Sequence, residues 1–194
     1  MQLARKVRAH LNQDHRYRHC VRVARSADIL AHIHGADSAK ARTAAMLHDL
    51  ARLYSTTQLL EECEHHGISV DDFERRNPIV LHAPLGAALA REQFGIEDPA
   101  VLSAITKHTL GAAEMSKLDC IVYLADALEP GRDFENRSTI WKLAQSDLRA
   151  AMSATIDDTM VYLHNLGREP APQTLAMQRI FSTSASQGVQ PSLN

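Results

Sequence analysis

Histidine and aspartate side chains that could bind metal ions recur along this 194-residue chain. His48 and Asp49 are adjacent at the end of the apolar segment Ala44–Leu50. Successive side chains on a helix project about 100° apart, but both can reach one point in a groove between helices. An imidazole beside a carboxylate offers mixed nitrogen and oxygen ligands, which suit zinc, manganese, iron or cobalt. The alternative is that His48 interacts with the helix dipole and Asp49 is solvated.

Four further polar side chains favour the metal interpretation. Asp126 and His82 each lie inside an otherwise apolar stretch, His19 lies near the start of a predicted helix, and His108 lies at the end of another. A buried carboxylate is costly unless it is paired or bound to a metal. Each of these groups alone is more often a hydrogen-bonded core residue than a ligand. Their presence on separate helices of one small protein favours a shared site.

Six such groups are more than a single ion needs. Four of them suffice for one open site that leaves room for water, namely His19, His48, Asp49 and Asp126. If Asp49 bridges, it can hold a second ion together with His82 and His108. Two ions about 3.5–4 Å apart form a clamp for displacement at phosphorus, in which one activates water and the other stabilises the leaving oxygen. The sequence therefore predicts two divalent ions, and the ligand set does not choose among iron, manganese, cobalt and zinc.

Helices must position these side chains, because helix start and stop signals recur and alternating strand patterns are almost absent. The predicted starts are Asp37 or Ser38, Ser55 with Gln58, Asp98 before Pro99, and Ser116 with Asp119. The predicted helices cover about residues 16–34, 39–50, 55–67, 98–108, 116–128 and 138–165, the last as one long helix or two short ones. The predicted fold class is therefore all-α.

Pro84 lies inside the apolar stretch Ile79–Phe94. Proline removes one backbone hydrogen bond and clashes with the preceding turn, so a helix here should be kinked or begin near Pro84. His82 then lies beside irregular backbone, where a ligand can face inward.

Length and composition fit one compact domain with a tail. Hydrophobic residues make up 45% of the chain and charged residues 23%, which excludes wholesale disorder. Because aromatic residues are only 5% of the chain, the core must rest on Leu, Ile, Val and Ala. We expect residues 1–168 to form the metal-binding domain, and residues 169–194 to form a C-terminal helix fragment and a flexible polar tail.

Charge and apolar patterning exclude several kinds of partner. The formal net charge of −2 lacks the basic surplus of a general nucleic-acid binder, and the arginines of Arg16–Arg25 are expected on a solvated face. No apolar run reaches the roughly 18 residues of a membrane span, and the basic N-terminus has no apolar region of a signal peptide. Three scattered cysteines without a C-x-x-C pair indicate a reducing, cytoplasmic location. A homodimer is compatible with the sequence, although no motif argues for it.

The order of these residues resembles that of a known enzyme family. His19, His48-Asp49 and Asp126 follow the H…HD…D order of HD-domain metal-dependent phosphohydrolases. Three further stretches narrow the resemblance to the YqeK group: Leu81-His-Ala-Pro-Leu-Gly86, Ala104-Ile-Thr-Lys-His-Thr-Leu-Gly111 and Ala125-Asp-Ala-Leu-Glu-Pro-Gly-Arg-Asp-Phe134. The resemblance covers roughly residues 15–165. It departs at Arg52, where members commonly have a lysine, so the reach and geometry of that cation differ.

The resemblance implies a fold, a cofactor and a reaction. The fold would be an HD-domain helical bundle with a metal site between helices, and the centre would hold two ions, with iron the family's usual metal. Members of the YqeK group cleave diadenosine tetraphosphate symmetrically into two ADP. A dinucleoside polyphosphate would then be the substrate, and neither a nucleic-acid polymer nor a membrane would be a partner.

A mechanism follows for this chain as a hypothesis. A metal-bound hydroxide attacks a central phosphorus of the tetraphosphate, with His48, Asp49 and Arg132 as the catalytic residues. Arg52 and Arg132 offset charge on the polyphosphate, Arg132 by a bidentate contact. The predicted phosphate contacts beside the second metal are Thr109 and the backbone at Gly111.

Three competing hypotheses remain at this point. The same metal site could act on a nucleoside monophosphate, a hyperphosphorylated guanosine nucleotide or a cyclic dinucleotide. A di-iron centre could instead carry out oxygen chemistry, which would make product formation depend on oxygen. A nucleotide sensor without turnover ranks last, because no ligand needed for catalysis is missing.

Overall fold

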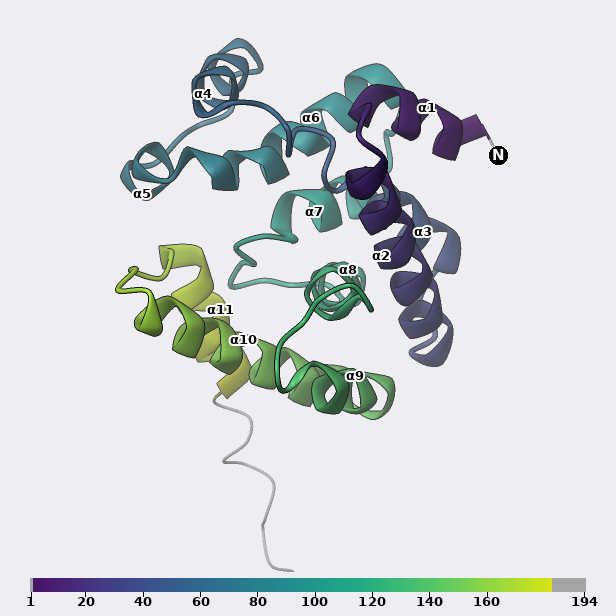
Figure 1. The fold of residues 1–194 in the computed structure, drawn as a ribbon, viewed down its shortest axis with the longest axis vertical. Coiled ribbons are helices and arrows are strands. Elements are labelled where there is room, and N and C mark those ends of the chain that lie inside the picture. Colours follow the sequence, from purple (N-terminus) through teal and green to yellow (C-terminus); the bar gives the residue numbers. More distant parts are fainter. Residues whose placement is uncertain (1, 183–194) are drawn as a thin grey trace, which may run out of the picture.

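The computed structural model describes residues 2–182, and its regular secondary structure is helical throughout that range (Figure 1). The predicted all-α fold class is confirmed. In chain order the elements are α1 (Gln2–Leu11), α2 (Asp14–Ile33), α3 (Ser38–Leu47), α4 (Thr56–His65), α5 (Asp72–Arg76), the 3-10 turn η1 (Pro78–Leu81), α6 (His82–Phe94), α7 (Pro99–Lys107), α8 (Lys117–Leu128), α9 (Arg137–Ser146), α10 (Leu148–Asn165) and α11 (Pro172–Ser182).

Four helices, α2, α3, α7 and α8, form the centre of the bundle. In Figure 1, α4, α5 and α6 lie on one side of this centre, and α9, α10 and α11 lie on the other. Fully buried aliphatic side chains such as Leu30, Leu47, Ile105 and Ile121 fill the interior. The expected aliphatic core is confirmed. Burial of each such side chain contributes about 1.5–3 kcal/mol.

The predicted helix caps are present. Asp37 accepts hydrogen bonds from the first amides of α3, and Asp98 does the same for α7. Ser55 at the start of α4 and Ser116 at the start of α8 each form a capping box with the residue three positions later. Each cap satisfies amides that would otherwise have no partner in the first helical turn.

Pro84 lies in the first turn of α6, because that helix begins at His82. The ring is tolerated there, since amides of a first turn have no intrahelical acceptor. Of the two alternatives for residues 138–165, the structure has two short helices, because Asp147 ends α9 and caps α10.

Three elements were not predicted from the sequence: α1, α5 and η1. In α1 only Val7 and Leu11 are buried, so its apolar stripe is too narrow to stand out. The C-terminal helix α11 buries Met177 and Phe181 in the same core as the rest of the chain. It therefore packs with residues 2–168, and the tail expected at 183–194 lies outside the described residues.

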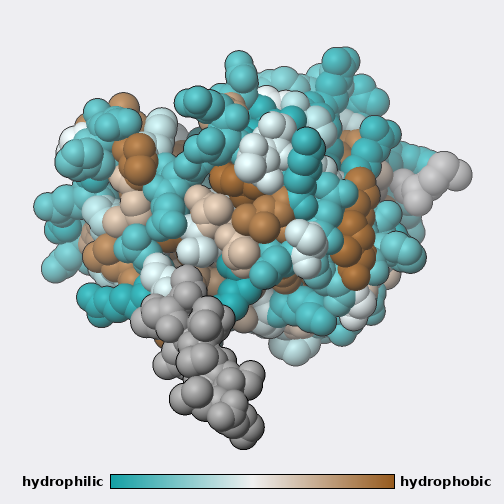
Figure 2. Space-filling model, turned by 90° about the horizontal axis from the view of Figure 1, so that it is seen from below, coloured by the Kyte–Doolittle hydropathy of each residue, from teal (hydrophilic) through white to brown (hydrophobic). Residues whose placement is uncertain are grey.

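The surface of the described chain is mixed in character. Figure 2 shows hydrophobic residues in separate patches among hydrophilic ones on the face seen from below. Exposed apolar side chains include Ile29, Ile33, Val161 and Leu166. Among residues 2–182, no helix has both the length and the apolar character needed to cross a bilayer.

Candidate metal centre

Helix ends and one helix interior bring the six predicted ligands together. The side chains come from α2, the turn directly after α3, the first residue of α6, the residue that ends α7, and α8. The six residues, in that order of elements, are His19, His48 and Asp49, His82, His108 and Asp126. All are buried except Asp126, which is partly exposed.

One half of the cluster consists of two imidazoles and a carboxylate. His19 Nε2 and His48 Nε2 lie 3.3 Å apart. Asp126 Oδ1 lies 3.1 Å from His19 Nε2 and 3.8 Å from His48 Nε2. The donor atoms of these three residues therefore converge tightly enough to bind one ion.

Asp49 joins this half to a second one. Its Oδ2 atom lies 3.6 Å from His19 Nε2 and 3.5 Å from His48 Nε2. Its Oδ1 atom lies 3.5 Å from His82 Nε2, and His82 Nε2 lies 3.1 Å from His108 Nε2. Each oxygen of one carboxylate thus faces a different pair of imidazoles. This is the arrangement required for a carboxylate that bridges two ions.

The backbone fixes which nitrogen of each imidazole faces the cluster. In His48, His82 and His108, Nδ1 lies 2.7, 2.5 and 2.7 Å from the carbonyl oxygen three residues earlier. We assign Nδ1 as a donor in each, so that Nε2 is the nitrogen that faces the other groups of the cluster. Ligand histidines in metalloproteins are oriented in this way by their second nitrogen. The donor set therefore fits divalent metal ions.

Burial and charge shift the pKa values inside the cluster. For His48, burial lowers the pKa, but the carboxylates of Asp49 and Asp126 outweigh it and raise the pKa to about 9. For His108, burial and the neighbouring imidazoles lower the pKa to about 3. Burial disfavours ionisation of Asp49 and Asp126, yet the surrounding cationic groups hold both pKa values below the ordinary range. Anionic carboxylates beside imidazole nitrogens are the state that binds metal.

Two arginines flank the carboxylates of the cluster. Arg16 Nη1 lies 2.8 Å from Asp49 Oδ2, and Arg132 Nη2 lies 2.6 Å from Asp126 Oδ1. The sequence interpretation of Arg16 as part of a solvated face is wrong, since its side chain is only 21% exposed. Helix α2 turns this residue toward His19, three positions later on the same face.

A cavity of about 350 Å³ opens onto the cluster. Its lining includes Arg52 and Arg132, two of the predicted phosphate contacts, together with Thr109. The Thr109 hydroxyl lies 3.2 Å from His82 Nε2 and 3.0 Å from His108 Nε2. The cavity thus combines the metal-binding atoms with cationic side chains and a hydroxyl, which suits an anionic phosphate ligand.

Comparison with known proteins agrees with this geometry. The HD domain family matches residues 16–131, which span all six cluster residues. The chain belongs to the HD domain family. It is 37% identical to "Bis(5'-nucleosyl)-tetraphosphatase, symmetrical" from Halalkalibacterium halodurans, over 88% of this chain and 90% of the relative. It is 36% identical to the protein of the same name from Bacillus subtilis, over 83% of this chain and 86% of the relative.

A solved HD structure has the same fold over nearly the whole chain. It comes from Clostridium acetobutylicum and is described as a predicted HD superfamily hydrolase involved in NAD metabolism. The TM-score is 0.89 at 32% sequence identity, covering 94% of this chain and 96% of the other. These relatives place the chain in the YqeK-type group of HD enzymes, as the sequence motifs predicted.

Sequence reasoning missed one buried carboxylate of this HD centre, Glu129. Its Oε1 atom lies 3.1 Å from His19 Nδ1, and its Oε2 accepts hydrogen bonds from Arg22 Nε at 2.5 Å and the Gly131 amide at 2.6 Å. Burial would raise the pKa of Glu129, but these donors lower it to about 2. Glu129 thus orients the His19 ring through Nδ1, as a backbone carbonyl orients the rings of His48, His82 and His108. Its place directly before Pro-Gly suggested only a helix end, which is why the sequence did not single it out.

Gly111, the other predicted phosphate contact, does not line this cavity. Its φ of +69° is in the left-handed region, and its amide donates to the Lys107 carbonyl at 2.9 Å at the end of α7. A Cβ at this position would lie 2.2 Å from Met177 Sδ. In the structure, Gly111 closes the turn that follows α7 and allows α11 to approach closely.

Cys20 is close to the cluster but lacks the character of a ligand. Its sulfur lies within the same small volume as donor atoms of His48 and Asp49. Burial, with the added effect of Asp49, raises the pKa of this thiol well above its usual value. The thiol is therefore protonated at neutral pH, as expected for a small buried apolar group.

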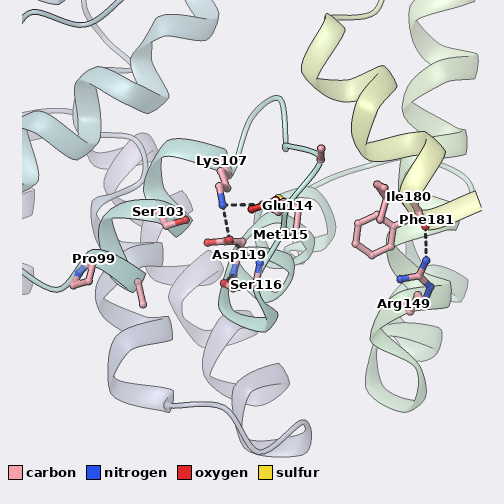
Figure 3. A pocket seen from close by; sticks show the side chains of 12 residues that line it. Pro99, Ser103, Lys107, Glu114, Met115, Ser116, Asp119, Arg149, Ile180 and Phe181 are labelled. Carbon is pink, nitrogen blue, oxygen red and sulfur yellow. Dashed lines mark hydrogen bonds and ion pairs between the residues drawn. The ribbon is translucent and has the colours of Figure 1, made fainter.

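A larger cavity, of about 650 Å³, lies on another side of α7 and α8 (Figure 3). Lys107 Nζ there donates to the Glu114 carbonyl at 2.8 Å and to Asp119 Oδ2 at 3.1 Å. None of the six cluster residues lines it. Size alone therefore does not identify the reactive cavity of this protein; the donor atoms do.

Proposed function

We propose that this HD protein hydrolyses diadenosine tetraphosphate, and related dinucleoside polyphosphates, symmetrically into two nucleoside diphosphates. The observation that carries the proposal is the bridging position of Asp49, whose two oxygens face two separate pairs of imidazoles. The similarity to two symmetrical tetraphosphatases over more than 80% of the chain supports the choice of substrate.

The residues present would hold two divalent ions. His19, His48, Asp49 and Asp126 would bind one, and Asp49, His82 and His108 the other. Ions bound there would supply an activated water as nucleophile and positive charge that stabilises the leaving oxygen. We propose iron as the metal, as the resemblance to the YqeK group implies, and the nitrogen and oxygen donors also accept manganese, cobalt and zinc.

The chain's own side chains would hold and orient the phosphate groups. Arg132 and Arg52 line the cavity and would neutralise charge on the tetraphosphate. Arg16 lines the same cavity and adds a third cation. The Thr109 hydroxyl, beside His82 and His108, would donate to a phosphate oxygen. Substrate bound this way would present a central phosphorus to the space between the two halves of the cluster.

The test is product analysis on protein purified without oxygen and assayed for bound metal. Diadenosine tetraphosphate should yield two ADP, and hydrolysis in H₂¹⁸O should place one ¹⁸O on one of them. His48→Ala, Asp49→Ala and Asp126→Ala should each lose at least a hundredfold in kcat/KM. His164→Ala, at an exposed histidine far along α10, is the matched control. Wild-type turnover in any of the three variants, or release of ATP and AMP, would refute the proposal.

A panel of other nucleotides tests the alternatives. It includes a nucleoside monophosphate, a hyperphosphorylated guanosine nucleotide and a cyclic dinucleotide. It also includes NAD, because the Clostridium structure is described as involved in NAD metabolism. Activity that requires oxygen would favour redox chemistry at the same centre.

A further inference from the structure

Another cavity, distinct from the one in Figure 3, adjoins the metal cavity, and we call it the second cavity. The C-terminal part of the chain forms one of its walls. The second cavity has a volume of about 680 Å³ and lies between η1 with the end of α5 and the segment from α10 to α11. Four residues line both cavities: Ile79, Val80, Thr109 and Thr159. The two cavities therefore adjoin at these four residues, which places both within reach of a ligand that has two parts.

Thr109 locates this junction relative to the reactive atoms. Its hydroxyl is 3.2 Å from His82 Nε2 and 3.0 Å from His108 Nε2. A group in the second cavity that touches Thr109 is thus separated from His82 and His108, the imidazoles of the proposed second ion, only by the Thr109 side chain. That distance suits a ligand whose phosphate groups lie at the metals and whose remainder extends outward.

The lining of the second cavity suits a nucleoside. Phe73, Ile79 and Leu163 supply apolar surface, and Thr56 supplies a hydroxyl. The charged residues that line it are Arg76, Arg168 and Glu169. Aromatic and apolar side chains stack on a base, and a few polar groups fix its orientation. Its volume lies within the roughly 300–1,000 Å³ typical of small-molecule sites.

Two hydrogen bonds join the opposite walls of this cavity. Gln173 of α11 donates to Asp71 Oδ2, the cap of α5, at 3.1 Å. Thr174 Oγ1 donates to the Leu110 carbonyl, directly after Thr109, at 2.9 Å. The start of α11 is thereby held against both the α5 side and the metal side. In Figure 1, α5 lies above α10 and α11 on the left side of the view.

We propose that this cavity binds one nucleoside of the substrate, with its base against Phe73 and Leu163, while the attached phosphates lie in the metal cavity. The inference rests on the proposed function. Residues 159–174, which form one wall, lie beyond residue 131, where the match to the HD family ends. The metal centre is thus built from the shared HD elements, whereas the nucleoside site combines Phe73 of those elements with the C-terminal segment.

The test compares a ligand that has a nucleoside with one that lacks it. ADP and inorganic pyrophosphate are titrated into the metal-loaded protein and its Phe73→Ala and Phe73→Leu variants, and the folded state is checked by thermal unfolding. Loss of base stacking should weaken ADP binding about tenfold or more and leave pyrophosphate binding unchanged. Tyr162→Ala, at an exposed aromatic residue of α10 that does not line the cavity, should change neither. Phe73→Leu keeps an apolar side chain at this half-buried position but removes the aromatic ring. If Phe73→Ala does not fold, the ADP affinity of Phe73→Leu tests the stacking contact instead.

Failure of this inference can be distinguished from failure of the proposed function. If the wild type hydrolyses diadenosine tetraphosphate and the Phe73 variants keep its KM and the ADP affinity, the nucleoside site is refuted while the function stands. If the wild type binds ADP in a Phe73-dependent way but leaves the tetraphosphate intact, the site stands and the proposed substrate is refuted. Equal weakening of ADP and pyrophosphate in folded variants would also overturn the inference, because the effect would then lie at the metals.

Discussion

At the scale of single residues, the cluster depends on how each imidazole is oriented. Three imidazoles are oriented by the backbone, whereas His19 is oriented by the Glu129 side chain. Glu129→Gln keeps the size of this side chain but removes the charge that faces His19 and Arg22. We expect a 10- to 100-fold loss in metal affinity, as is usual when the partner of a ligand histidine is changed. Competition with a chelator of known affinity measures this loss.

The matched control for that prediction is Glu135→Gln, at an exposed glutamate outside the cluster. It should bind metal as the wild type does. A folded Glu129→Gln protein with unchanged metal affinity would show that Glu129 serves only the fold.

The protonation of His48 predicts how metal binding depends on pH. Burial lowers its pKa, but the charges of Asp49 and Asp126 raise it to about 9 in the metal-free cluster. Below pH 9 the metal-free imidazole therefore carries a proton that an ion must displace. Affinity should rise with pH, by up to tenfold per unit between pH 6.5 and 8.5, and ion uptake at pH 7 should release about one proton. Calorimetry in buffers of different ionisation enthalpy counts that proton; affinity that does not change with pH would contradict the assignment.

At the scale of helices, the contact between α11 and the turn that follows α7 depends on Gly111. An alanine there has a strained φ of +69° and a Cβ 2.2 Å from the buried sulfur of Met177. Gly167 has a similar φ of +63° but open space around it, so Gly167→Ala isolates the backbone strain. We expect Gly111→Ala to lower the free energy of unfolding by about 1–3 kcal/mol more than Gly167→Ala does, because overpacking adds to strain. Urea unfolding measures the difference, and equal losses in the two variants would show that Met177 adjusts freely.

The sequence predicted helices best where local chemistry marks their ends. The caps at Asp98 and Ser116 were predictable, because one side chain bonds to amides two or three residues away. The extent of the shared core was not, since α11 packs through Met177 and Phe181 on residues distant in sequence. Tertiary contacts of this kind leave no periodic signal long enough to recognise.

The candidate site was predicted in the same uneven way. Asp126 and His82 stood out because ionisable groups are unusual inside apolar stretches, and His48 and Asp49 stood out as an adjacent pair at the end of one. His19 and His108 were added by their places at the ends of predicted helices. Glu129 and Arg16 lie in polar stretches, where charged residues are ordinary, so only the folded chain shows that they face His19 and Asp49. The sequence therefore indicates which side chains are candidate metal ligands. The charged residues that pair with those ligands are brought to them by tertiary packing, which the sequence pattern does not show.

At the scale of the whole molecule, bound ions should tie together five elements that lie far apart in the sequence. Ligands that bind only the folded state stabilise it by mass action, by about 4 kcal/mol for one ion at a thousand times its dissociation constant. For a chain of this size, that corresponds to a rise of about 8–16 °C in the unfolding midpoint. We expect this rise when chelator-treated wild-type protein is reloaded with iron, manganese or cobalt. Scanning calorimetry measures it directly.

Variants of a ligand that faces both halves of the cluster and of a ligand that faces only one test whether two ions contribute to this stabilisation. Asp49 faces both halves of the cluster, so Asp49→Ala should remove most of the metal-dependent rise. His108 belongs to one half, so His108→Ala should bind one ion per chain and keep part of the rise. Elemental analysis gives the ion count for each variant. Equal metal content in Asp49→Ala and His108→Ala would mean that Asp49 does not bridge, and the two halves would then bind their ions independently.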